Sequence, residues 1–200
     1  MLKRMAIALC LLASPVVDAA RVAVPVQVPV QVEQAPSKAD VIKALSARRA
    51  HNLASFRAYR NGGVYPHNNV RRGPLNVWKD RDGHLCAAAT MIDKDGQHDL
   101  VAATAKATNF IRLLDVTEGP LMDWILTSGF TIEEIDRIQE PMMMDDRDEP
   151  DYQVADANLA KDYAKTDTWL VGHAKASLDV AASRLLENPG LARRLVDGTL

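Results

Sequence analysis

Cys86 is the residue of this sequence best suited to nucleophilic chemistry, because a thiolate is a strong nucleophile. It follows a turn at Gly83 and stands where a helix is predicted to begin, so backbone N–H groups and the helix dipole would favour its anionic form. His84, two residues upstream, is the candidate base. However, Leu85 and Ala87 are typical of a core, where a free cysteine behaves as a small hydrophobe. Cys86 and His84 are therefore either a catalytic pair or a buried thiol with an unrelated neighbour.

The polar loop at 64–74 is the second place where side chains could bind a ligand. It carries a histidine, two amides and two guanidinium groups: His67, Asn68, Asn69, Arg71 and Arg72. Arginine forks bind carboxylates and phosphates in a bidentate way, and loops on a rigid scaffold often carry function. The alternative is a solvated connection whose asparagines adopt left-handed turns. We therefore treat the loop as a candidate site for a small anionic ligand.

Metal and cofactor motifs are missing from the sequence. The five histidines form neither an HExxH pattern nor a closely spaced pair. The stretch 93–96 (DKDG) imitates the start of a calcium loop but has no bidentate glutamate at the later position, which favours an ordinary turn. There is no glycine-rich phosphate loop, no G-x-S-x-G and no CxxC. The sequence predicts no metal site and no cofactor.

The first 20 residues have the pattern of a cleavable secretory signal peptide. Lys3 and Arg4 supply the positive charge, 5–13 (MAIALCLLA) supply a short apolar stretch, and Pro15 ends that stretch. The apolar stretch is shorter than the roughly 20 residues that span a bilayer. An uncleaved N-terminal anchor is the alternative. We expect an exported product, periplasmic or extracellular.

The composition limits the possible partners. The formal charge of −2 does not indicate the basic surface that binds nucleic acid. No segment after the signal is apolar enough to cross a membrane, so we expect no transmembrane segment in the mature product. Of the two cysteines, Cys10 would leave with the signal, so Cys86 would be the single cysteine of the mature chain and form no disulfide within it.

Composition shifts divide the chain into five segments. The signal peptide at 1–20 precedes a tether rich in proline, valine and glutamine at 21–36. A globular core is predicted at 37–141, an acidic linker at 142–151, and a helical C-terminal extension at 152–200. The fold class is mainly α (α+β), a compact helical domain with a small two-strand element.

Helical periodicity and capping residues predict the individual elements. Helices are expected at 37–60, 85–92, 99–108, 118–127, 131–139, 152–165, from Asp167 to about 185, and from Asn188 onward. Strands are expected at 75–79 and 110–116. Thr131 and Glu134 have the spacing of a capping box. Gly62 and Gly63 should end the first helix.

Residues 51–141 carry a set of short motifs that are distinctive in combination. The motifs are Arg57-Ala58-Tyr59-Arg60, Tyr65-Pro66-His67-Asn68, Asp82-Gly83, Cys86-Ala87, Trp124, Ser128-Gly129 and Ile138-Gln139. With these motifs the chain resembles a group of exported bacterial proteins over about half its length. The group is uncharacterised and has no assigned activity, so the resemblance implies a shared fold and a signal peptide, and no reaction.

Two classes of function follow from the residues. The leading hypothesis is a soluble exported binding or interaction module of the bacterial cell envelope, whose partner is an unknown envelope protein or a small anionic ligand. Its motivation is the lack of known catalytic motifs, together with the tether and the polar loop. The alternative is a thiol-dependent enzyme that uses Cys86 at a helix N-terminus.

Overall fold

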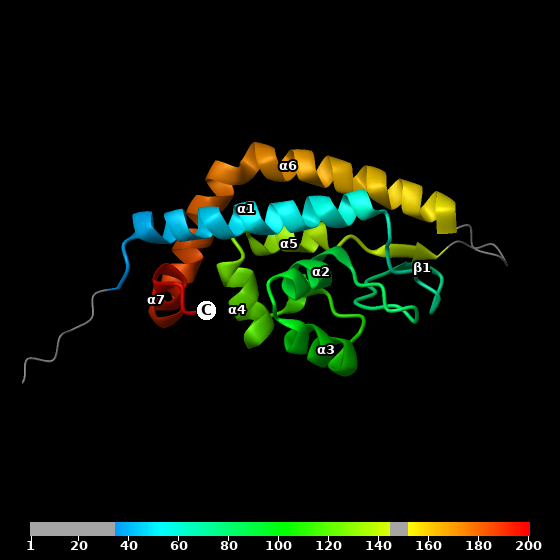
Figure 1. Cartoon of the computed structure of the whole chain (residues 1–200), viewed down its shortest axis with the longest axis horizontal. Coiled ribbons are helices and arrows are strands. Elements are labelled where there is room, and N and C mark those ends of the chain that lie inside the picture. Colours follow the sequence, from blue (N-terminus) through cyan, green and yellow to red (C-terminus); the bar gives the residue numbers. More distant parts are fainter. Residues whose placement is uncertain (1–34, 145–151) are drawn as a thin grey trace, which may run out of the picture. The chain divides into compact units, whose positions relative to one another are not determined.

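The computed structural model describes residues 35–144 and 152–200 (Figure 1). The predictions for the signal peptide at 1–20, for all but the end of the tether at 21–36, and for the acidic run at 145–151 lie outside these residues. Within them, no helix combines the length and the apolar character that crossing a bilayer requires.

Helices dominate the described chain, which confirms the mainly α fold class. The elements in order are α1 (Lys38–Gly62), β1 (Gly73–Leu75), α2 (Ala87–Lys94), α3 (His98–Ala107), the 3-10 helix η1 (Leu113–Asp115), α4 (Pro120–Thr127), α5 (Ile132–Ile138), β2 (Met142–Met144), α6 (Tyr152–Leu186) and α7 (Pro189–Asp197). β1 and β2 pair antiparallel, with Gly73 opposite Met144 and Leu75 opposite Met142.

The predicted helix ends agree with the structure because each has its own local signal. The Ser37 side chain accepts from the backbone N–H of Asp40 at the start of α1, and Gly63 ends α1 with a left-handed φ of 63°. Thr131 and Glu134 form a reciprocal capping box at α5. Asn188 caps α7, which has proline in its first turn.

The two-strand element exists, but the predicted strands were wrong. Only Leu75 of the predicted strand at 75–79 lies in β1, and the strand at 110–116 is absent, because Leu113–Asp115 form η1. Gln139 explains the difference: its amide donates to the carbonyl of Ile111 and accepts from the N–H of Leu113, both at 2.8 Å. A side-chain amide thus satisfies the extended backbone that a strand partner would otherwise satisfy.

The predicted break between the helices at 152–165 and 167–185 was also wrong, since α6 is continuous. Asp167 was expected to cap a new helix. Instead its carboxylate accepts from Arg57 at 2.9 Å and from Arg60 at 2.8 Å, both on α1. The aspartate therefore joins two helices and leaves the backbone of α6 uninterrupted.

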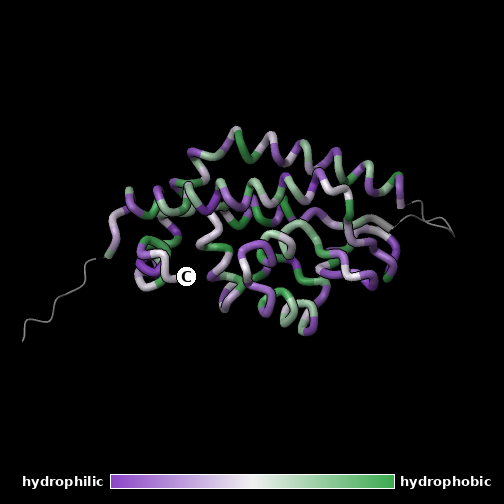
Figure 2. Tube along the Cα trace, viewed as in Figure 1, coloured by the Kyte–Doolittle hydropathy of each residue, from purple (hydrophilic) through white to green (hydrophobic). Residues whose placement is uncertain are grey.

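The core has two parts, and both contain residues that follow residue 151. The larger part surrounds the fully buried Trp78 and Trp124 and includes Tyr163 and Leu170 of α6. The smaller part joins the start of α1 to the end of α6 and to α7. Figure 2 shows hydrophobic and hydrophilic residues interspersed along α1 and α6, the pattern of helices that bury one face.

A buried ion pair fixes α1 against α5 and α6. The Arg49 guanidinium donates two hydrogen bonds to the Glu134 carboxylate, each 2.7 Å long, and further bonds to the carbonyls of Gly129 and Leu170. Ser177 donates to the same carboxylate at 2.8 Å. Because both Nη atoms of Arg49 and both carboxylate oxygens of Glu134 have partners, the pair is compatible with burial, and losing one member would leave an uncompensated charge.

Candidate functional site

A hollow of about 310 Å³ opens beside the predicted binding loop, between that loop, the chain leading into β2 and the first turns of α6. His67 and Asn68 line it from the loop. Its acidic groups come from three carboxylates: Glu140, Asp156 and Asp162. We call this hollow the acidic pocket.

Apolar side chains form the rest of the acidic pocket. Pro66, Pro141, Met142 and Leu159 line it together with the ring of Tyr152. No lysine or arginine is among the described residues that line it. The pocket thus combines carboxylates with apolar walls, which is the composition of a site for a small molecule with a fixed orientation.

Asn68 holds the loop in shape from within. Its amide nitrogen donates to the carbonyl of Gly73 at 2.8 Å and to that of Arg71 at 2.9 Å, and its oxygen accepts from the N–H groups of Val70 and Arg71. The same nitrogen lies 3.3 Å from the carbonyl of Met142 in β2. Asn68 is almost fully buried. It therefore acts on the loop backbone and presents little side chain to a ligand.

His67 connects the loop to the start of α6. Its ring stacks on the ring of Tyr152, with centroids 4.0 Å apart and an angle of 15° between the planes. Its Nε2 lies 3.3 Å from Oδ1 of Asp156. The side chains of His67 and Asp156 are 24% and 29% exposed, so both are within reach of a ligand.

Glu140 and Asp162 complete the charge of the acidic pocket. Asp162 has a cation beside it, because Lys165 Nζ lies 2.6 Å from its Oδ1. Burial raises the pKa of Glu140, and the Asp162 carboxylate raises it further, while Arg137 acts in the opposite direction. Glu140 is therefore a carboxylate whose charge is poorly compensated by the protein itself.

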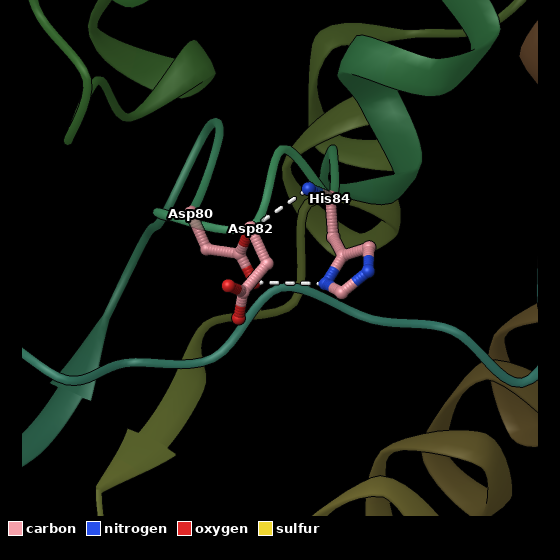
Figure 3. Close-up of side chains that lie close together, drawn as sticks. All are labelled: Asp80, Asp82 and His84. Atoms are coloured by element: carbon pink, nitrogen blue, oxygen red, sulfur yellow. Dashed lines mark hydrogen bonds and ion pairs between the residues drawn. The ribbon is translucent and has the colours of Figure 1, made fainter.

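Asp80, in the turn at 80–83, bonds to His84 (Figure 3) and also to the backbone of the loop. Its buried carboxylate accepts from the backbone N–H of His84 at 2.8 Å, from Nδ1 of His84 at 3.0 Å and from the backbone N–H of His67 at 3.2 Å. Burial alone would raise the pKa of Asp80, but these donors lower it below its ordinary value. The aspartate thus stays ionised and keeps His67 in place.

The same turn contains a group that sequence analysis did not single out as metal-binding. One ligand atom each from Asp80, Asp82 and His84 lies within 4.8 Å of the others. Carboxylate and imidazole ligands suit several divalent metals. The N–H donors described above already occupy both oxygens of Asp80, however, and Asp82 is exposed. We therefore assign Asp80 to positioning the loop.

Cys86 lies at the start of α2, as predicted, and its Sγ accepts from the backbone N–H of Ala89 at 3.5 Å. The side chain is buried, and this burial raises the pKa of the thiol to about 11. The thiol is consequently protonated at neutral pH. His84 bonds to Asp80. These contacts favour the structural interpretation of Cys86, and the catalytic one stays an untested prediction.

Arg71 and Arg72 are exposed and are not among the residues that line the acidic pocket. Arg71 Nη2 lies 3.5 Å from the carbonyl of Pro74 in β1. Asn69 is half-buried and also lies outside the lining residues. The expected anionic ligand at these three residues stays a prediction, separate from the acidic pocket.

Sequence reasoning found the loop but missed the acids opposite it. Glu140 follows α5, while Asp156 and Asp162 lie on α6, so the three carboxylates meet only across the fold. The sequence contained one signal that could have found part of this set. Tyr152, Asp156 and Leu159 recur at helical spacing, which places them on one face of a helix.

Comparison with known proteins adds no relative to these observations. The chain matches no protein-family model, no curated protein and no solved structure. The resemblance to a group of exported bacterial proteins stays a prediction. A fold does not by itself define a function, so the geometry of the site carries the assignment of a ligand.

Proposed function

We propose that the protein is an exported binding module of the bacterial cell envelope, and that it binds a small organic cation in the acidic pocket. Export rests on the signal pattern at 1–20. The observation that carries the ligand assignment is the set of three carboxylates in a hollow lined by no described lysine or arginine. The ligand is accordingly an amine or guanidine with an apolar body.

The three carboxylates differ in the partners that the protein places beside them. Asp156 faces His67, and Asp162 faces Lys165. Glu140 is the partly buried acid whose pKa burial raises. A cationic group placed near Glu140 would relieve this cost, because two opposite charges about 4 Å apart attract by roughly 4 kcal/mol before desolvation at an effective dielectric constant of ~20.

The apolar walls define the rest of the ligand. Met142 and Leu159 offer aliphatic contact, and the stacked rings of His67 and Tyr152 offer a flat π surface. A cation over an aromatic face gains roughly 0.5–1 kcal/mol at a partly exposed site. An alkylammonium or a lysine side chain has this combination of an apolar stem and a charged head.

The proposal is tested by removing one pocket charge at a time. The probe is N-acetyl-lysine methylamide, and the measurement is isothermal titration calorimetry on the purified chain without residues 1–20. Glu140→Gln is expected to weaken binding about tenfold, which corresponds to ~1.4 kcal/mol. Asp156→Asn is expected to weaken it less, since His67 Nε2 already lies 3.3 Å from that carboxylate.

Glu118→Gln is the matched control, because Glu118 is an exposed glutamate that lies outside the acidic pocket. It removes the same charge from the whole molecule. Equal losses in Glu140→Gln and Glu118→Gln would mean that general surface charge attracts the probe, and would refute the site.

A further inference from the structure

A second hollow adjoins the acidic pocket. Glu140 and Pro141 line both, and the second hollow has a volume of about 590 Å³. It extends toward Trp169 of α6 and toward Arg112 and Arg137. We call the two hollows together the long groove. A ligand that fills only the acidic pocket would leave more than half of this groove unused.

One face of α6 runs along the whole length of the groove. Asp162 lines the acidic pocket and Trp169 lines the second hollow, and two helical turns separate these residues, so they project from the same face. Tyr152, at the other end of the pocket, is about 25 Å from Trp169 along the helix axis. An extended polypeptide of roughly seven or eight residues has this length.

The second hollow differs from the acidic pocket in its chemistry. The Arg137 guanidinium lies over the Trp169 ring, 4.7 Å from its centroid, and Arg112 bonds to the Asp136 carboxylate at 3.2 Å. Groups of both signs therefore lie around a half-buried indole. The amide of Asn76 is also part of this wall and can donate or accept hydrogen bonds.

This mixture suits a peptide better than a neutral polysaccharide. A peptide offers backbone N–H and C=O groups to the amides, and charged or aromatic side chains to Arg137 and Trp169. A neutral sugar chain would cover charged groups without pairing them, which costs free energy. The described lining of the acidic pocket has no arginine, whereas the second hollow has Arg112 and Arg137 beside Glu133 and Asp136, and this difference gives a bound peptide a direction.

We infer that the ligand of the long groove is an extended peptide segment of about eight residues, with a lysine or arginine seated in the acidic pocket and its chain lying past Pro141 to Trp169. This inference rests on the proposed function and names the class of partner. The groove would bind unfolded or terminal segments of other polypeptides. The basic residue fixes the register, and Trp169 and Arg137 add the affinity that a single amine lacks.

The test compares N-acetyl-lysine methylamide with pools of acetylated, amidated octapeptides. The pools carry lysine, or leucine as control, at the first or the eighth position, with the other positions random. Binding is followed by calorimetry and by tryptophan fluorescence, since Trp78 and Trp124 are fully buried and Trp169 is half-buried. One of the lysine pools is expected to bind at least tenfold more tightly than the single lysine derivative.

Two variants test whether the second hollow provides the tighter binding of the lysine pool. Trp169→Ala and Arg137→Gln are each expected to remove most of the tenfold advantage. Trp169→Ala should leave the affinity for N-acetyl-lysine methylamide unchanged, and Arg137→Gln should not weaken it, because that change removes a cation near Glu140. Arg137 is exposed, so Arg137→Gln keeps the test valid should Trp169→Ala weaken the fold.

The failures of the two proposals are distinguishable. If the lysine derivative binds in the acidic pocket but no pool exceeds it, or if the advantage survives both variants, the peptide inference is wrong and the proposed function stands. If the lysine derivative fails to bind at all, the proposed function is wrong, and the inference falls with it. Tighter binding of cellohexaose than of any pool, lost in Trp169→Ala, would replace the peptide by a polysaccharide and overturn the inference.

Discussion

Glu140 is the residue through which the charge of the acidic pocket responds to pH. The pKa of its carboxyl is raised by burial first and by Asp162 second, while Arg137 and Lys165 lower it and Asp136 raises it. A group with a raised pKa takes up a proton at a higher pH than a free glutamate, whose pKa is ~4.3. A cationic ligand binds the ionised form more tightly and so opposes that protonation.

This linkage predicts the direction of the pH dependence of binding. Affinity for N-acetyl-lysine methylamide should be greatest at neutral to mildly alkaline pH and should fall, up to about tenfold, as the pH is lowered through the raised pKa of Glu140. The ligand amine keeps its charge over this range, because its pKa is ~10.4. Calorimetric titrations at a series of pH values measure the effect.

Glu140→Gln provides the comparison for this prediction. The variant should bind weakly at every pH and lose the step that belongs to Glu140. Affinity that rises as the pH falls would contradict the assignment of Glu140.

At the scale of the elements, the packing of α1 against the turn between α4 and α5 depends on Gly129. This glycine has a φ of 86°, and a Cβ there would lie 2.4 Å from the carbonyl oxygen of Leu45 and 2.6 Å from the backbone nitrogen of Arg49. Both contacts are with backbone atoms, which cannot rotate away. Gly129 therefore allows the approach that the Arg49–Glu134 ion pair requires.

Gly129→Ala is expected to destabilise the fold by at least about 3 kcal/mol, which combines backbone strain with loss of close packing. Gly63→Ala is the control, because Gly63 has a left-handed φ of 63° and no atom within 4 Å of its hypothetical Cβ. It should cost only about 1–2 kcal/mol. Urea unfolding measures both. Equal losses would show that φ alone matters at Gly129 and that the approach of α1 does not.

The elements also show which features of the fold can be predicted from the sequence. Helix ends such as Ser37 and Thr131 were predicted correctly because their capping groups lie within three residues. The strand at 110–116 and the break before Asp167 were predicted incorrectly. In both cases the deciding partner, Gln139 or the arginines of α1, is distant in the sequence.

Some residues of the candidate site could likewise be predicted from the sequence, and others could not. His67 and Asn68 were identified from the loop, because a cluster of polar types between ordered segments is a local signal. Glu140 and Asp162 were not, because nothing near them in the sequence distinguishes pocket carboxylates from surface ones. Cys86 was placed correctly at a helix start, but its burial depends on residues from the rest of the core.

For the molecule as a whole, α6 joins the two parts of the core and the long groove. Tyr163 and Leu170 pack into the larger core, and Ala182 and Leu185 pack into the smaller one. The face that bears Tyr152, Asp162 and Trp169 lines the groove. Because the same helix supports the core and the groove, we expect the groove to be a rigid feature of the fold.

The central claim is that positive charge on the ligand drives binding in the acidic pocket. It is tested most directly by comparing N-acetyl-lysine methylamide with N-acetyl-norleucine methylamide, an uncharged analogue with a similar apolar stem, in calorimetric titrations of the wild-type protein at pH 7.5 and low ionic strength. The account predicts that the lysine derivative binds at least about tenfold more tightly, and that added salt reduces the difference. Equal affinities, or tighter binding of the norleucine derivative, would contradict it.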